Sequence, residues 1–307
     1  MSTGLEARLR AVLDERYHDH HPFNRRMHEG GLSREEIQIW VKNRYYYQTR
    51  IPIKDGLILG KAGEPEFRRE WIQRIQDHDG TKPGEGGLEL WLRLGEAVGL
   101  TREQVADLSD VLPGVRAACD DYVAFVTSHD LLESVAASLT EIGASKIMLV
   151  RLEAFEKHYS WVASEGLNYF RTRTKQAPRD ASWGMQFVIE NAHTPEDQER
   201  CVAALERKCQ ILWRLLDAVE AAHARFTLSD AAQLRDDGDE AGGLVVLPER
   251  AVELNASGRE ILELCDGARS ALEIAAELRR RHPQVERAAS DTHEFLAQMS
   301  KLGVLRS

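Results

Sequence analysis

Several stretches of this sequence with helical spacing carry cationic or phenolic side chains on faces that otherwise look buried. Arg44, Tyr47 and Gln48 share one such face by their three- and four-residue spacing. Arginine is seldom buried without a negative partner, and its planar guanidinium binds carboxylates through two parallel hydrogen bonds. Comparable side chains recur on four further stretches, namely Arg74 and His78, Thr140 and Arg151, Tyr169 and Arg173, and Lys208. We therefore predict an interior cavity for a molecule with several carboxylates.

An ordinary structural role is open for each cation taken singly. The cations could pair with carboxylates or face solvent, and the carboxylates available are Asp55, Asp77, Glu141 and Glu206. Their recurrence on separate helices favours a binding site. His78 is the preferred general base, because neutral imidazole accepts protons near neutral pH and His78 lies one turn after Arg74. It could instead cap the end of a helix before Gly80.

A histidine-rich run from Tyr17 to Pro22 raises the question of a metal. Glu15-x-x-His18 and Glu190-x-x-His193 have the spacing of di-iron helical bundles. Such matches arise easily by chance in a chain with 50 acidic residues and 11 histidines, and two further inward glutamates would be needed. The run could also cap a helix C-terminus, where the helix dipole favours histidine. We expect no metal and keep a di-iron oxidase as the alternative.

Composition excludes several classes of protein. The 307 residues carry a net charge of −10, which argues against a general nucleic-acid binder. No apolar run approaches the roughly 20 residues of a membrane span, and the first 14 residues are too charged for a secretory signal. The four cysteines form no CxxC pair, which is typical of reduced thiols. We expect a cytoplasmic protein without a nucleic-acid or membrane partner.

Helix start signals place the elements that would position these side chains. Capping boxes begin at Ser33 and Thr101, while Pro65 and Pro195 suit first helical turns. Residues 1–226 are therefore predicted to form one all-α domain of about seven helices.

The pattern changes after Phe226. Three short strands are predicted at 232–234, 244–247 and 251–254, the first two joined by a charged loop at 235–240. Three helices follow, at 257–265, 271–281 and 290–302. The predicted fold class is mainly α, with a small α+β domain at 227–307.

Several motifs of the first domain occur together in one known family. They are Tyr17–Phe23, Asn43–Gln48, Ile51–Asp55, Gln73–Gly80, Trp91–Gly95, Ser138–Glu141 and Gln176–Asp180. With these motifs, residues 5–224 resemble the pyrroloquinoline-quinone synthase (PqqC) family. The resemblance implies a haem-oxygenase-like helical bundle that forms a homodimer. It also implies ring closure and oxidation of a quinoline-dione tricarboxylate by O2, with release of H2O2 and without a metal or redox cofactor.

The resemblance also implies roles for individual residues. His78 would accept or donate protons together with His18, and Tyr169 and Arg173 would bind and polarise dioxygen. The implied substrate-binding residues are Arg44, Tyr47, Gln48, Arg74, Tyr122, Thr140, Arg151 and Lys208. Met148 departs from relatives that have histidine at this position, and methionine cannot shuttle a proton. Either other residues suffice, as we expect, or the later oxidations are impaired.

The last 80 residues resemble a second family. Val252–Asn255 and Ile261–Gly267 are similar to motifs of the PqqD family, whose small winged-helix-like modules bind peptides by strand addition. The resemblance implies a PqqA-like precursor peptide and a PqqE-like radical-SAM enzyme as partners, tethered to the oxidase by the fusion. A stabilising appendage or dimer contact is the alternative for this module. A non-catalytic pathway scaffold is an alternative for the whole chain.

Overall fold

The computed structural model describes residues 2–235 and 242–307, and contacts between Cα atoms divide the chain into two compact units, 1–217 and 218–307. The domain boundary expected after residue 226 stays a prediction. The charged loop expected at 235–240 lies, apart from Arg235, outside the described residues.

The first unit is helical throughout its described residues. Its eleven α-helices exceed the seven or so predicted, because short helices such as α2, α6 and α8 carry little periodicity. They are α1 (Ser2–Arg16), α2 (Pro22–His28), α3 (Arg34–Lys61), α4 (Pro65–Asp79), α5 (Gly86–Ala97), α6 (Arg102–Ala106), α7 (Pro113–Ser128), α8 (Leu131–Ala137), α9 (Glu141–His158), α10 (Asn168–Asn191) and α11 (Pro195–Ala221). Short 3₁₀ turns are η1 (His18–His20), η2 (Ser138–Thr140) and η3 (Ser164–Leu167).

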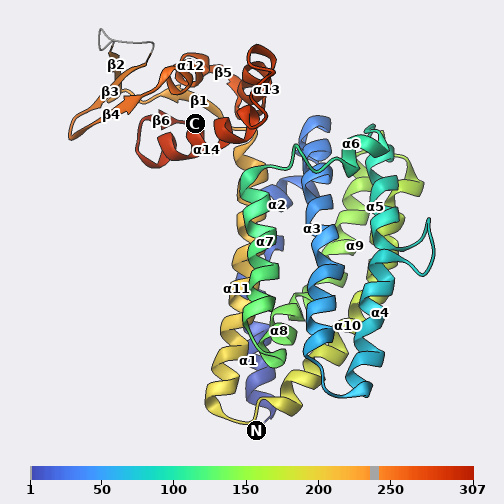
Figure 1. Cartoon of the computed structure of the whole chain (residues 1–307). Coiled ribbons are helices and arrows are strands. Elements are labelled where there is room, and N and C mark those ends of the chain that lie inside the picture. Colours follow the sequence, from blue (N-terminus) through green and yellow to red (C-terminus); the bar gives the residue numbers. More distant parts are fainter. Residues whose placement is uncertain (1, 236–241) are drawn as a thin grey trace. The chain divides into compact units, whose positions relative to one another are not determined.

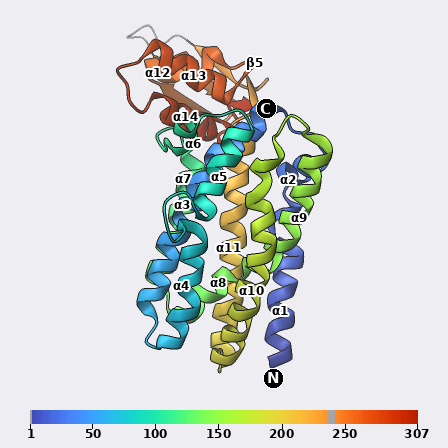
Figure 2. The same cartoon turned by 90° about the vertical axis from the view of Figure 1, so that its right-hand side faces the viewer.

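In Figure 1 the long helix α3 lies between α7 and α4, and Figure 2 shows it beside α4 toward one side of the bundle. It packs against α4, α5, α7 and α8, while α9 and α10 lie side by side along much of their length. Both predicted capping boxes are present, at Ser33 before α3 and Thr101 before α6. Helices α4 and α11 begin at the predicted prolines. Because α3 is surrounded on several sides, polar residues on it are enclosed by the neighbouring helices.

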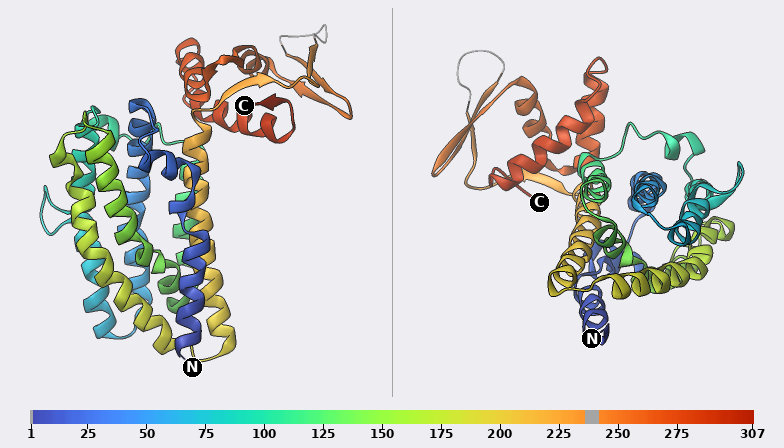
Figure 3. Two further views of the ribbon diagram at one scale, coloured as in Figure 1. Left: turned by 180° about the vertical axis from the view of Figure 1, so that it is seen from behind. Right: turned by 60° about the horizontal axis from the view of Figure 1, so that its bottom comes forward.

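The second unit combines two small antiparallel sheets with three helices (Figure 3). One sheet has the order β2 (Gln233–Arg235), β3 (Gly243–Leu247), β4 (Arg250–Leu254), and these are the three predicted strands. The other has the order β5 (Asp266–Ser270), β1 (Arg225–Leu228), β6 (Leu305–Arg306). Helices α12 (Ala256–Leu264), α13 (Ala271–Arg281) and α14 (Ala288–Lys301) complete the unit. Strands β1, β5 and β6 escape sequence prediction because they are short and show no clear alternation.

Among the described residues, no helix combines the length and the apolar character that crossing a membrane would require.

The end of α4 depends on glycine. Gly80 caps the helix with φ 80° and ψ 172°, a conformation that is almost confined to glycine. A Cβ at this position would lie 2.7 Å from the backbone carbonyl carbon of Glu85. Gly84 also has a positive φ of 86°, but a Cβ there would meet nothing within 4 Å.

We expect Gly80→Ala to destabilise the first unit more than Gly84→Ala, whose backbone strain alone should cost about 1–2 kcal/mol. Gly80→Ala adds a backbone collision to that strain, so its loss should be clearly larger. Urea unfolding followed by circular dichroism measures both changes. Equal losses of unfolding free energy in the two variants would show that the backbone of Glu85 moves away from a Cβ at position 80 without a cost in stability.

Candidate functional site

An interior cavity lies among the helices of the first unit, at the face of α3 that the sequence singles out. Its volume is about 40 Å³, room for a few water molecules. The lining residues are Tyr17, His18, Arg44, Tyr47, Gln48, Ile51, His78, Thr140, Glu141, Ala144, Met148, Tyr169, Arg173 and Leu212. The structure thus brings eight of the twelve candidate residues to one cavity.

The remaining four candidates, Arg74, Tyr122, Arg151 and Lys208, are buried but do not line the cavity. Lys208 and Tyr122 lie behind Tyr47: the Lys208 ammonium donates a hydrogen bond to the Tyr47 hydroxyl at 3.0 Å and sits 3.5 Å from the centre of the Tyr122 ring. These residues can therefore reach a ligand only through the side chains in front of them or after these move.

Six lining residues were not among the candidates, namely Tyr17, Ile51, Glu141, Ala144, Met148 and Leu212. Glu141 was considered only as an ion-pair partner, and Leu212 carries no chemical signal of its own. Tyr17 begins both the histidine-rich run and the first family motif, and these were the available clues. The Tyr17 ring packs on α9 at Gly143, where a Cβ would lie only 2.6 Å from a ring carbon. Glycine at 143 thus allows Tyr17 to lie flat against the helix.

One group of buried cations has no carboxylate partner within 4 Å among the described residues. This group, called here the unpaired cations, consists of Arg44, Arg151 and Lys208, none more than 6% exposed. Arg44 stacks over the Tyr47 ring at 4.0 Å, and Arg151 donates to the Asn24 side-chain oxygen at 3.0 Å. Two further guanidinium nitrogens of Arg151 lack any hydrogen-bond partner in the described part of the chain.

Mutual repulsion among the unpaired cations adds to the cost of burial. Burial, together with the charges of Arg44 and Lys54, lowers the pKa of Lys208 well below its usual value. Burial and the charge of Arg44 also lower the pKa of Arg151 to about 9. Burial and repulsion therefore disfavour the charged forms of these side chains, and a nearby anion would relieve that cost.

A second group of charges is balanced. This group, called here the neutral network, contains Lys54, Arg74 and Arg173 together with Asp55, Glu141 and Asp180. Glu141 joins two helices, because its carboxylate lies 2.5 Å from Arg173 on α10 and 3.4 Å from Arg74 on α4. Burial alone would raise the pKa of Glu141, but Arg173 and Arg74 outweigh it and lower the pKa to about 2. Ordinary pairing thus accounts for Arg74 and Arg173.

Two buried histidines face the cavity in neutral form. Nδ1 of His78 lies 3.1 Å from the Arg74 carbonyl oxygen, so it carries the proton and leaves Nε2 as the acceptor. Burial and the charge of Arg173 lower the pKa of His78 to about 4. Neither ring nitrogen of His18 has a partner among the described residues, and burial with the charge of Arg44 lowers its pKa well below the usual value.

Tyr169 and Arg173 occupy successive turns of α10 on the same side of the cavity. The Tyr169 hydroxyl donates to the Gln48 side-chain oxygen at 3.0 Å, which ties α10 to α3. The Tyr169 ring also packs edge-on against Trp91 of α5, with ring centres 4.7 Å apart. A phenol and a guanidinium are thereby held beside the imidazole of His78.

The rest of the histidine-rich run is structural. His20 contacts the Asp14 carbonyl oxygen at 2.9 Å near the end of α1, as the capping alternative predicts, whereas His21 accepts from the Phe23 amide and begins α2. Within the described chain, no group of three or more histidine, cysteine or acidic residues could hold a metal. Glu15 and Glu190 are exposed, so the two Glu-x-x-His pairs do not form the inward-facing set that a di-iron site requires.

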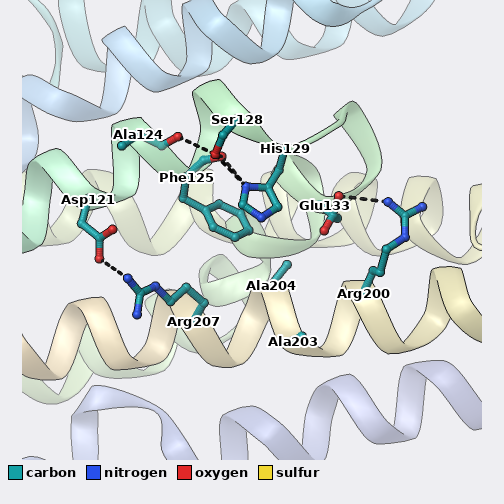
Figure 4. Close-up of a pocket in the computed structure, with 10 residues that line it drawn as sticks. All are labelled: Asp121, Ala124, Phe125, Ser128, His129, Glu133, Arg200, Ala203, Ala204 and Arg207. Carbon is teal, nitrogen blue, oxygen red and sulfur yellow. Dashed lines mark hydrogen bonds and ion pairs between the residues drawn. The ribbon is translucent and has the colours of Figure 1, made fainter.

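A larger pocket of about 460 Å³ lies between α7, α8 and α11 (Figure 4). Its arginines are already paired, Arg207 with Asp121 at 2.6 Å and Arg200 with Glu133 at 3.0 Å. His129 is stacked on Phe125, with ring centres 3.8 Å apart. Because its arginines are already paired, this pocket offers an anionic ligand less than the smaller interior cavity does.

Each unit contains a match to a known family. Residues 6–218 match the TENA/THI-4/PQQC family, and residues 243–305 match the family of Coenzyme PQQ synthesis protein D (PqqD). The pyrroloquinoline-quinone synthase of Gluconobacter oxydans (strain 621H) is 46% identical over 219 residues, covering 71% of this chain and 92% of that protein. That of Pseudomonas aeruginosa (strain LESB58) is 51% identical over 208 residues, covering 67% and 83%.

Solved structures agree with the predicted bundle. A domain with a haem oxygenase-like fold from Shewanella denitrificans OS217 superposes with a TM-score of 0.57 at 15% identity, covering 71% of this chain and 89% of that one. At that identity the likeness shows the fold alone, and it confirms the haem-oxygenase-like prediction. The sequence matches confirm both family resemblances: the chain belongs to the TENA/THI-4/PQQC family and carries a PqqD domain in its second unit.

Proposed function

We propose that this chain is a pyrroloquinoline-quinone synthase, an O2-dependent oxidoreductase that closes a ring in a quinoline-dione tricarboxylate and oxidises it, with release of H2O2. Relatives at 46% and 51% identity bear that name. The observation that carries the proposal is the set of unpaired cations beside the cavity. A substrate with three carboxylates supplies the negative charge that Arg44, Arg151 and Lys208 lack.

Substrate binding enlarges the cavity. A bicyclic tricarboxylate does not fit into about 40 Å³, so lining side chains must move apart as it enters. Movement of Tyr47 would open the path between the ligand and Lys208, which now bonds to the Tyr47 hydroxyl. The enclosing helices then exclude water, which strengthens each ion pair formed with the substrate.

The neutral imidazoles are suited to proton transfer during the oxidation. Each two-electron step removes two hydrogens from the substrate and converts one O2 to H2O2. His78, with its Nε2 lone pair free, accepts protons released from carbon, and His18 serves the same function at the opposite wall. Because the electron-rich substrate can reduce O2 itself, the protein contributes orientation and electrostatics.

Dioxygen and its reduced forms are assigned to Tyr169 and Arg173. The guanidinium of Arg173 stabilises negative charge as it develops on oxygen, and the phenol can donate a hydrogen bond once it leaves Gln48. Glu141 keeps Arg173 in place through their ion pair at 2.5 Å. Gln48, Thr140 and Arg74 complete the substrate-binding set, and Met148 has no proton-transfer role.

The PqqD domain is assigned a peptide. Strand β4 is an edge of its sheet and packs beside α12, so a PqqA-like precursor peptide could add as a further strand there. A PqqE-like radical-SAM enzyme would receive the peptide from this module. We also propose, from family likeness, a cytoplasmic homodimer.

Replacing the proposed base should slow the chemistry without removing the binding site. We expect His78→Ala to lower kcat about 10²-fold or more, because general-base catalysis is lost. Quinone affinity should change little, since the unpaired cations remain. Oxygen consumption and quinone absorbance in single-turnover assays measure the first effect, and equilibrium binding measures the second.

His20→Ala is the control, because His20 is a histidine of the same helical unit that does not line the cavity. An unchanged rate in His78→Ala, or an equal loss in both variants, would contradict the assignment of His78.

Ligand binding should also take up protons. Lys208 and His18 have lowered pKa values in the empty cavity, and a bound tricarboxylate raises both. A group whose pKa rises on binding favours the complex at low pH, so quinone affinity should fall as pH rises through the range in which the empty site loses its protons. Calorimetry in two buffers of different ionisation enthalpy measures the uptake.

Lys208→Met should reduce that uptake by the contribution of its ammonium group. A binding heat that is the same in both buffers would show that no net proton is taken up and would contradict this prediction.

A further inference from the structure

Met148 is the one sulfur-containing side chain among the described residues that line the interior cavity. It lies on α9 one turn after Ala144, with 6% of its surface exposed. Met185 is equally exposed at 6% but lines a different pocket, and Met27 is fully buried in the bundle. The chain therefore contains a thioether inside the cavity and a matched one outside it.

A thioether in this position differs chemically from the buried thiols. Peroxide oxidises a methionine sulfur directly, whereas a cysteine must first ionise to react. Burial raises the pKa of the Cys119 thiol to about 12. Cys119 therefore stays protonated and unreactive, and Met148 is the oxidisable side chain that lines the cavity.

We propose that H2O2 formed in the cavity oxidises the Met148 thioether to the sulfoxide, and that this modification limits the number of turnovers. The inference rests on the proposed function, which supplies the peroxide. The sulfur lone pair forms the S–O bond as the O–O bond breaks, and a proton passes from the transferred oxygen to the departing one. One H2O2 thus yields one methionine sulfoxide and one water.

Electrostatics explains why the modification would matter. A sulfoxide oxygen is a strong hydrogen-bond acceptor, while the thioether is a weak one. Arg44 lines the same cavity without a carboxylate partner, so it provides a donor for the new oxygen. The modified side chain then competes with a substrate carboxylate for the same cation and occupies part of the cavity.

The test uses the full-length protein with its quinoline-dione precursor in air-saturated buffer that contains catalase. Quinone absorbance follows turnover, and peptide mass spectrometry follows the gain of one oxygen atom at Met148 and Met185. We expect Met148 sulfoxide to increase in step with quinone, with Met185 unchanged. Catalase should not prevent the modification, because it removes only peroxide that has left the cavity.

Variants provide a second measurement. Each rate of quinone formation is divided by the initial rate of the same variant. By this measure Met148→Leu should stay active after the wild type has slowed. Met185→Leu should decline as the wild type does. If Met148→Leu does not fold, mass spectrometry of the wild-type protein still tests the proposal, because it compares sulfoxide at Met148 with sulfoxide at Met185.

The possible failures are distinguishable. Quinone formation with unmodified Met148, equal oxidation of Met185, or complete protection by catalase would overturn the inference and leave the proposed function standing. Absence of quinone, together with absence of peroxide in a parallel reaction without catalase, would overturn the proposed function and, with it, this inference.

Discussion

Uncompensated positive charge in the interior is the constraint on which the rest of this structure depends. A buried cation without a counter-ion costs several kcal/mol, and the bundle contains three basic side chains of this kind, of which Arg44 lowers the pKa of the other two. Burial of apolar and aromatic side chains around α3 must offset that cost. The arrangement is reasonable only if the natural state of the site includes an anion.

The bundle separates the two kinds of charge along the same helices. On α3, Arg44 belongs to the unpaired cations and Asp55 to the neutral network, eleven residues or about 16 Å apart along the axis. On α9, Arg151 likewise belongs to the unpaired cations and Glu141 to the neutral network. The cavity therefore has a positive end and a balanced end, and an asymmetric acid entering it would be oriented by charge alone. His78 and Arg173 lie at the balanced end, where a contact with the Arg74 carbonyl oxygen holds His78 and the ion pair with Glu141 holds Arg173.

Helical periodicity was enough to predict that Arg44, Tyr169 and Arg173 would meet, because each falls on the buried face of a long, well-delimited helix. It could not predict which cations would find carboxylates. Asp180 reaches Arg74 only because α10 packs near α4, and such distances depend on the packing of whole helices. Leu212 was beyond prediction for a different reason, since an apolar lining residue resembles any core residue. In the second unit, the strands β1, β5 and β6 depend on partners distant in sequence and leave no local pattern.

The contact between Tyr17 and Gly143 extends these conclusions to other sequences. A methyl group at 143 would push the phenol ring from its seat toward the space that a ligand must occupy. A homologue could thus keep every charged residue of the cavity and still fail to bind a carboxylate ligand, because alanine at position 143 would displace the Tyr17 ring. In a comparison of homologous sequences, glycine at position 143 is therefore as informative about ligand binding as any arginine of the cavity.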